Sequence, residues 1–250
     1  MLFMNPVSVL CFGNSLTQGF PINHPYAIAL GGTLRNNFPH IPFAIDVQGL
    51  PGDQVVSPPG SYLPRLDILY DEVDTPYNWM IILGGTNDLN QYRNVDTIYE
   101  YLIKEWNFAL SRGTQVLALT VPECGACDPI LDTQRDYLNN LIRSHKAENF
   151  HVFDLHKAMP YWSMPEEERG RIWIDGVHFT EEGYDRMGTL VGAALHDLMT
   201  GKNLKFGAYT GQAPLRTELK TLTEQVDSNT LDESLRIVTS RVMRSRLSAV

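Results

Sequence analysis

The sequence predicts an α/β domain in which a parallel sheet is covered by helices on both faces. Two observations lead to this fold class. Short apolar runs alternate with segments of helical periodicity along the chain. Most of the apolar runs also end at a polar or glycine-rich turn, as buried parallel strands do. The 250 residues, with 43% hydrophobic and 20% charged content, are enough for one large domain with a substantial core.

Five runs are expected to be strands because they are short, apolar and rich in β-branched residues. In chain order they are Val7–Phe12, Phe43–Val47, Trp79–Leu83, Gln115–Thr120 and His151–Leu155.

Three of the intervening segments carry a clear helical pattern. In the segment from Asp96 to Ser111, and again in Thr133–Ala147, apolar residues recur at helical spacing and form one face. A third helix is expected to start after Thr180 and to run to about Met199. Thr180 is a good N-cap, and Glu181 and Glu182 follow in the first turn, where the helix dipole favours carboxylates.

Four turns are expected to share one edge of the sheet, because the carboxyl ends of parallel strands lie together. These turns are Gly13-Asn14-Ser15, Gly49-Leu50-Pro51-Gly52-Asp53, Gly84-Gly85-Thr86-Asn87-Asp88 and Val121-Pro122-Glu123. Open α/β sheets bind their ligands at this edge. The four loops therefore predict one convergent site.

Residues 1–200 are expected to form the main domain and residues 201–250 a distinct extension. The last fifty residues hold 8 Lys/Arg and 5 Asp/Glu, against 12 and 24 in residues 1–200. Residues 201–215 are interpreted as a linker. Spaced apolar positions over 216–247, such as Leu219, Leu222 and Val226, predict one or two amphipathic helices on the body or on a partner subunit. A homodimer through this extension is one expectation.

Composition narrows the possible partners. A net charge of −9 disfavours nucleic-acid binding, which needs a basic face. No apolar run approaches the roughly 18 residues that would span a bilayer. The N-terminus has no basic region followed by a cleavage pattern, and three cysteines fit a reducing compartment, so a cytoplasmic location is expected.

Each polar turn alone has a commonplace interpretation. Ser15 can be an ordinary turn serine, and Asp175 with His178 can simply precede a capped helix. Several such motifs after successive strands make that interpretation unlikely. In order, they are Phe12-Gly13-Asn14-Ser15-Leu16-Thr17, Gly49-x-x-Gly52-Asp53, Gly85-Thr86-Asn87-Asp88 and Asp175-x-x-His178-Phe179-Thr180.

Together these motifs resemble the four sequence blocks of the SGNH (GDSL-type) hydrolase family, over about residues 7–199. The resemblance implies a flavodoxin-like, three-layer α/β/α fold. It also implies hydrolysis of carboxylic esters of small molecules through an acyl-enzyme, with no metal and no cofactor.

The resemblance also implies roles for individual residues. Ser15 is expected to be the nucleophile, His178 its general base, and Asp175 the group that orients the imidazole. The oxyanion hole would consist of the N–H groups of Ser15 and Gly52 and the side-chain amide of Asn87. Asn14 departs from the family pattern, in which aspartate precedes the serine. Asn14 has none of the triad roles, so activity is expected to survive the change.

Other motifs are weaker. Cys124-x-x-Cys127 lacks a second pair at zinc spacing, so two free thiols on a rim loop are expected rather than a metal site. Residues around Tyr161, Trp162 and Trp173 can be either a lid or a packed surface loop. Several residues next to the motif loops are candidates for shaping specificity: Phe20, Pro21, His24, Leu89, Tyr92 and Arg93.

Three alternative functions are weighed against the esterase. An acyltransferase would pass the same acyl group to an alcohol or amine instead of water. A non-catalytic binding protein on this fold is disfavoured by the intact Ser15, Asn87, Asp175 and His178. A nucleotide-binding protein is disfavoured because both glycine-rich phosphate-binding motifs are missing.

Overall fold

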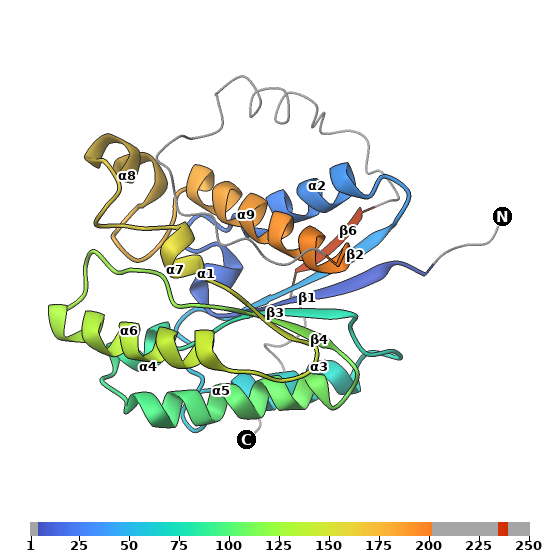
Figure 1. The fold of residues 1–250 in the computed structure, drawn as a ribbon, viewed down its shortest axis with the longest axis horizontal. Helices are drawn as coiled ribbons and strands as arrows, with labels where there is room; N and C mark the ends of the chain where they lie inside the picture. The colour runs from blue at the N-terminus through green and yellow to red at the C-terminus, as the bar shows by residue number, and fades with distance from the viewer. Residues whose placement is uncertain (1–4, 202–234, 240–250) are drawn as a thin grey trace.

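A six-stranded, all-parallel sheet forms the centre of the protein in a computed structural model that describes residues 5–201 and 235–239 (Figure 1). The strand order is β5-β4-β3-β1-β2-β6. The strands are β1 (Val7–Gly13), β2 (Phe43–Gly49), β3 (Trp79–Leu83), β4 (Gln115–Leu119), β5 (Phe150–Phe153) and β6 (Leu235–Thr239). The predicted parallel α/β fold and its first five strands are confirmed, with ends shifted by up to two residues.

Helices cover both faces of the sheet, as Figure 1 shows. One layer contains α2 (Ala27–Asn37), α7 (Leu155–Ala158), α8 (Glu166–Ile172) and α9 (Glu181–Met199). The opposite layer contains α3 (Tyr62–Asp71), α4 (Thr86–Asn90), α5 (Val95–Leu110) and α6 (Pro129–Ser144). The short helix α1 (Ser15–Gln18) follows β1 directly.

The central strand β1 shows why its sequence is apolar throughout. Val9 and Cys11 belong to the core shared with α2 and α9, whereas Leu10 and Phe12 belong to the core shared with α3 and α5. All four are fully buried. Successive side chains of a strand point to opposite faces, so a strand covered on both sides has no polar alternation.

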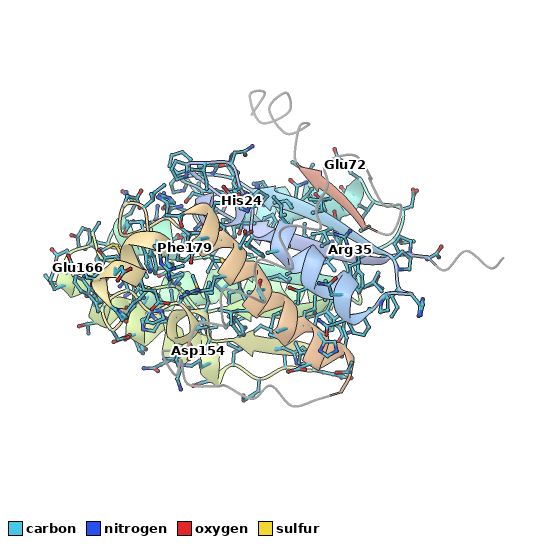
Figure 2. The ribbon with its side chains drawn as sticks, turned by 90° about the horizontal axis from the view of Figure 1, so that it is seen from above. His24, Arg35, Glu72, Asp154, Glu166 and Phe179 are labelled. Atoms are coloured by element: carbon cyan, nitrogen blue, oxygen red, sulfur yellow. A yellow bond between two sulfur atoms is a disulfide. The ribbon has the colours of Figure 1, made fainter. Side chains whose placement is uncertain are left out.

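The long helix α9 packs closely on α2, beside it in the view from above (Figure 2). A Cβ atom at Gly188 would lie 2.1 Å from the carbonyl oxygen of Tyr26, so only glycine allows this approach. Thr180 caps the helix as predicted, because its Oγ1 accepts a hydrogen bond from the N–H of Gly183 at 3.2 Å. The capped start of α9 fixes the end of the preceding loop, which contains His178.

One prediction for the C-terminal extension is wrong. Residues 235–239 form β6, which pairs with β2 in parallel, and not part of an amphipathic helix. Ile237 packs against the core on the side of α2 and α9. Its burial and the β-branched run Ile237-Val238-Thr239 favour a strand at this sheet edge. The predicted linker and the remaining predicted helical positions lie in 202–234 and 240–250, outside the described residues.

Among the described residues, no helix is both long enough and apolar enough to cross a membrane.

A carboxyl group is buried in the core beneath the β2–α3 loop. Glu105 of α5 is fully buried, and neither of its carboxylate oxygens has a hydrogen-bond partner within the described part of the chain. Burial raises the pKa of Glu105 well above its usual 4.5, and the nearby carboxylates of Asp88 and Asp53 raise it further. The folded protein therefore holds a proton here that the unfolded chain releases more easily.

This proton makes stability depend on pH. As pH rises above 4.5, the ordinary pKa of glutamate, the unfolded chain loses the proton first, and the free energy of unfolding falls. Glu105→Gln removes the carboxyl group and with it this fall in the free energy of unfolding. Denaturant titrations from about pH 5 to about pH 8 should show the variant gaining on the wild type by up to about 1.4 kcal/mol per pH unit. Glu100→Gln, an exposed site on the same helix, serves as the control. A gap between Glu105→Gln and wild type that stays constant with pH would contradict the account.

Candidate active site

Ser15 sits at the point where β1 ends and α1 begins. The Asn14 Oδ1 atom accepts a hydrogen bond from the N–H of Leu16 at 3.1 Å and so caps this short helix. A Cβ atom at Gly13 would lie 2.3 Å from Thr17 Oγ1 and 2.8 Å from the carbonyl oxygen of Leu83, so the strand must end in glycine. This sharp turn leaves the Ser15 side chain at the carboxyl edge of the sheet, with 8% of the residue exposed.

The loop between α8 and α9 brings His178 and Asp175 to the same edge. His178 Nε2 lies 3.0 Å from Ser15 Oγ, and His178 Nδ1 lies 2.8 Å from Asp175 Oδ2. The other carboxylate oxygen of Asp175 accepts hydrogen bonds from the N–H groups of Val177 (2.9 Å) and His178 (2.7 Å). The structure thus joins the three predicted residues in one hydrogen-bonded chain.

The electrostatics of Asp175 favour one arrangement of protons. Partial burial would raise the pKa of Asp175. Hydrogen bonds from the His178 ring and from the N–H groups of His178 and Val177 outweigh that effect and lower the pKa below its usual 3.8. Asp175 is therefore a carboxylate at neutral pH, and it selects the imidazole tautomer that carries its proton on Nδ1. The lone pair of Nε2 then faces the hydroxyl of Ser15.

Gly52 and Asn87 lie on two neighbouring loops that are tied together. The Asn87 Nδ2 group donates a hydrogen bond to the carbonyl oxygen of Asp53, at 2.8 Å. A carboxamide has two N–H donors, so one remains for a ligand. Gly52 has a φ of +79°, and a Cβ atom there would have no neighbour within 4 Å, so its backbone borders open space. This loop can present N–H donors to a bound molecule.

Asp88 holds the loop that carries Gly52 through hydrogen bonds. Its carboxylate, which is fully buried, accepts hydrogen bonds from the N–H groups of Val55 (2.9 Å) and Val56 (3.0 Å). Burial raises the pKa of Asp88, and these hydrogen bonds partly offset the increase. Asp88, the residue after Asn87, therefore holds the loop that carries Gly52 against α4.

Arg65 of α3 is a buried cation that sequence reasoning missed. It is 1% exposed, and it donates to Asp53 Oδ2 (2.6 Å), to the carbonyl oxygen of Gly13 (3.2 Å) and to that of Gln48 (2.5 Å). Its guanidinium also lies 4.5 Å from the centre of the Phe12 ring. Arg65 joins the ends of β1 and β2 to the residue after Gly52. Its position on the apolar face of a predictable helix was the available signal.

Phe20 is the best placed of the predicted specificity residues. Its ring meets the His178 ring edge-on with centroids 5.0 Å apart, and 41% of Phe20 is exposed. Its N–H donates to the carbonyl oxygen of Ser15, and its own carbonyl accepts from the Tyr184 hydroxyl. The other candidates differ: Leu89 is buried and His24 is paired with Asp185.

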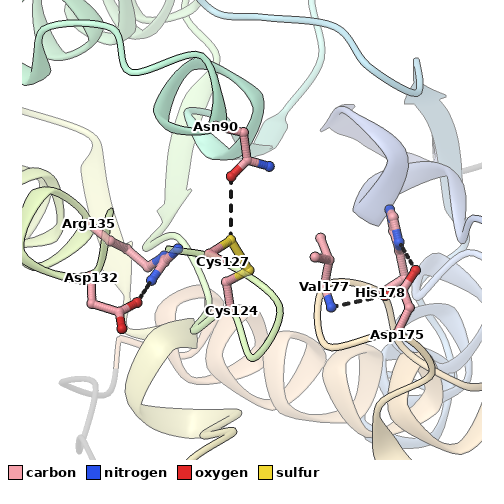
Figure 3. The surroundings of a disulfide bond; sticks show 8 residues. All are labelled: Asn90, Cys124, Cys127, Asp132, Arg135, Asp175, Val177 and His178. Carbon is pink, nitrogen blue, oxygen red and sulfur yellow. Dashed lines mark hydrogen bonds and ion pairs between the residues drawn. A yellow bond between two sulfur atoms is a disulfide. The ribbon is translucent and has the colours of Figure 1, made fainter. Parts of the chain in front are cut away.

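The expectation of two free thiols at Cys124 and Cys127 is wrong, because these residues form a disulfide (Figure 3). The turn between β4 and α6 brings their Cα atoms to 5.4 Å, which is within the range for a disulfide. Cys11 is a free, buried cysteine. No group of three or more His, Cys, Asp or Glu side chains in the described residues could hold a metal ion.

Comparisons with known proteins identify a family and similar folds. The model of the GDSL-like lipase/acylhydrolase family matches residues 11–186. None of the curated proteins matches the chain in sequence. A G-D-S-L family lipolytic protein from Veillonella parvula has a similar structure, with a TM-score of 0.58 and 21% identity over 79% of this chain and 99% of that one.

Two further solved structures are similar in fold. A lipase/acylhydrolase from Enterococcus faecalis is 22% identical, with a TM-score of 0.56, over 76% of this chain and 96% of that one. A carbohydrate esterase family 3 protein from Talaromyces cellulolyticus is 14% identical, with a TM-score of 0.54, over 79% of this chain and 100% of that one.

Removing Arg65 should destabilise the fold because it leaves the Asp53 carboxylate buried without its cation. Arg65→Met is expected to lower the free energy of unfolding by about 3–5 kcal/mol, measured by urea titration. Arg135→Met is the matched control: Arg135 is also buried, but its partner Asp132 is 41% exposed and can be solvated, so the loss should be smaller.

The double variant Arg65→Met/Asp53→Asn separates charge from packing. Removing the stranded carboxylate should restore part of the lost stability. If the double variant is no more stable than Arg65→Met, the ion pair is not the source of the loss.

Proposed function

The chain belongs to the GDSL-like lipase/acylhydrolase family, and from this premise we propose that it is a serine esterase in which Ser15, His178 and Asp175 carry out the reaction. The observation that carries the proposal is the pair of hydrogen bonds from Ser15 Oγ to His178 Nε2 and from His178 Nδ1 to Asp175 Oδ2, at 3.0 and 2.8 Å. A serine hydroxyl becomes a useful nucleophile only when a base accepts its proton.

In the proposed acylation step, Ser15 Oγ attacks the ester carbonyl carbon while its proton passes to His178 Nε2. The imidazolium that forms is stabilised by the Asp175 carboxylate, which stays ionised throughout. His178 then gives the same proton to the departing alkoxide as the C–O bond breaks. The products of this step are the free alcohol and an acyl group on Ser15.

In the second step, water replaces the alcohol. His178 takes a proton from the water, the hydroxide attacks the acyl carbonyl, and Ser15 Oγ leaves with the proton that His178 returns. The free acid is released and the site returns to its starting state.

The negative charge that develops on the carbonyl oxygen needs donors that are already in place. We assign this function to the N–H groups of Ser15 and Gly52 and to the free N–H of the Asn87 side chain. Three sets of hydrogen bonds hold these donors in place. Arg65 donates to Gly13 and Asp53, and Asp88 accepts from the N–H groups of Val55 and Val56. The Asn87 side chain donates to the carbonyl oxygen of Asp53. Donors that are held rigidly before the reaction stabilise charge most effectively.

The proposed substrate is a small-molecule ester, and the reaction as assigned uses no cofactor or metal. The cytoplasmic location and a homodimer through residues 201–250 stay predictions.

The nucleophile assignment predicts a specific loss. In wild-type protein, a fluorophosphonate probe should label one serine, identified by peptide mass spectrometry as Ser15. Ser15→Ala should lose both labelling and hydrolysis of p-nitrophenyl esters. Ser111→Ala, at the exposed end of α5 just before β4 begins, should behave as the wild type does. Labelling that persists in Ser15→Ala would rule out the assignment.

Asn87 should act on the transition state and not on binding. Asn87→Ala is expected to lower kcat by roughly 100- to 1000-fold with little change in KM, as loss of one oxyanion donor does. Gln91→Ala, at the exposed C-cap of the same helix, is the control for helix damage. A variant with unchanged kcat would remove Asn87 from the oxyanion hole.

Phe20 should influence which ester is preferred because its exposed ring borders His178. Across p-nitrophenyl esters of increasing chain length, Phe20→Ala should shift the order of kcat/KM values, whereas Phe20→Leu should largely retain it. Ile28→Ala, an exposed apolar residue on α2, is the control. An equal loss for every ester would mean that Phe20 supports His178 and does not select substrate.

A further inference from the structure

The loop between β4 and α6 contains a reactive group that ester hydrolysis does not use. Cys124 and Cys127, which are three positions apart in the sequence, form a disulfide and so close a small ring. Figure 3 shows Asn90 above this disulfide and Asp175, Val177 and His178 to its right. The question is whether the state of this bond can influence the histidine.

The disulfide loop touches the histidine loop through its backbone. The N–H of Gly125 donates a hydrogen bond to the carbonyl oxygen of Gly176, at 2.8 Å. A Cβ atom at Gly176 would lie 2.9 Å from the backbone nitrogen of Ala126, so the backbones of the two loops are in direct contact. Gly176 lies between Asp175 and His178. Any change in the shape of the disulfide ring therefore reaches the segment that positions the imidazole.

The other side of the disulfide loop is also braced. The Glu123 carboxylate accepts hydrogen bonds from the N–H groups of Tyr161 (2.5 Å) and Trp162 (2.8 Å). A Cβ atom at Gly125 would overlap the Tyr161 ring, 2.0 Å from its nearest atom. The disulfide loop therefore contacts both this aromatic segment and Gly176.

The two sulfurs differ in access. Cys124 is 3% exposed, whereas Cys127 is partly exposed and directly precedes Asp128, the N-cap of α6. An incoming thiolate therefore reaches Cys127 more easily. The Asn90 Oδ1 atom lies 3.4 Å from Cys127 Sγ and would accept a hydrogen bond from this sulfur once it is a thiol. The loop thus has a place for the reduced state as well.

We propose that Cys124 and Cys127 form a redox-active site that exchanges electrons with a dithiol, and that the state of this site sets the rate of the ester hydrolysis proposed above. A thiolate of the dithiol attacks Cys127 Sγ, forms a mixed disulfide and releases Cys124 as a thiolate, which takes up a proton. The second thiol of the dithiol then attacks the dithiol sulfur that is bonded to Cys127, and Cys127 is released as a thiol. The protein gains two thiols and the dithiol becomes a disulfide; a disulfide oxidant reverses the exchange.

A local effect is expected because the ring is small. Loop-closure entropy grows with the number of residues that a disulfide encloses, so this short ring stabilises the whole fold less than a disulfide closing a long loop would. Its main consequence is the fixed shape of residues 124–127. Reduction should loosen the Gly125–Gly176 contact and the position of His178 while the fold persists.

The test uses the full-length protein, prepared with oxidised glutathione and then treated with dithiothreitol as the dithiol. Thiol counting by alkylation and mass spectrometry should show two new thiols, at Cys124 and Cys127. On reduction, kcat for a p-nitrophenyl ester should fall by roughly 3- to 30-fold, and reoxidation should restore it. Amide hydrogen exchange of residues 174–178 should become faster, while Tm changes little.

Cys124→Ala/Cys127→Ala should have the low kcat of the reduced protein and not respond to dithiothreitol. Cys11→Ala should respond as the wild type does. Cysteines that remain reduced under oxidant, a disulfide that resists dithiothreitol, or an equal kcat in both states would overturn the proposal. If Ser15 is not labelled by a fluorophosphonate in either state, the esterase assignment fails; the thiol count and the exchange of residues 174–178 still decide the redox site.

Discussion

The parallel alignment of β1, β2 and β3 is the constraint on which the rest of the site depends. Cys11 of β1 is aligned with Val47 of β2 on one side and with Ile81 of β3 on the other. The three strands therefore finish at one edge, and the loops that follow them carry Ser15, Gly52 and Asn87. Glycine at the end of β1 and at the start of the β2 loop lets these backbones meet. Without this alignment the motifs would remain separate turns.

Polar groups under this edge then hold the loops in fixed positions. Arg65 donates hydrogen bonds to two carbonyl groups and one carboxylate, and Asp88 accepts hydrogen bonds from two N–H groups of the β2–α3 loop. Buried charges of this kind are costly unless they are paired and hydrogen-bonded. Here their pairing adds hydrogen bonds to a loop whose Val55 and Val56 side chains are already buried in the core, and a rigid loop is what an oxyanion hole requires.

Much of the fold could be predicted from local sequence. The five apolar runs that became β1 to β5, and Thr180 at the start of α9, depend on patterns within a few residues. The motif residues Ser15, Asp175 and His178 were also recognisable, since each follows a strand or precedes a helix in a set order. The burial of Arg65 could have been inferred from its place beside Tyr62, Leu66 and Leu69 on the apolar face of α3. Its partners could not, because Asp53 and the carbonyl groups of Gly13 and Gln48 come from other parts of the chain. The segment at Leu235 fits either a helix or a strand by spacing, and only its place beside β2 decides between them. The disulfide depends on the Cα separation of Cys124 and Cys127, which follows from the shape of the loop.

The central claim is that Ser15 carries the acyl group between the two steps. Acid quenching of the protein within the first turnovers of a p-nitrophenyl ester, followed by proteolysis and mass spectrometry, tests it directly. The peptide containing Ser15 should gain the mass of the acyl group and lose it again as turnover ends. An acyl group found on another residue, or product formed with no acylated peptide at any time, would contradict the account.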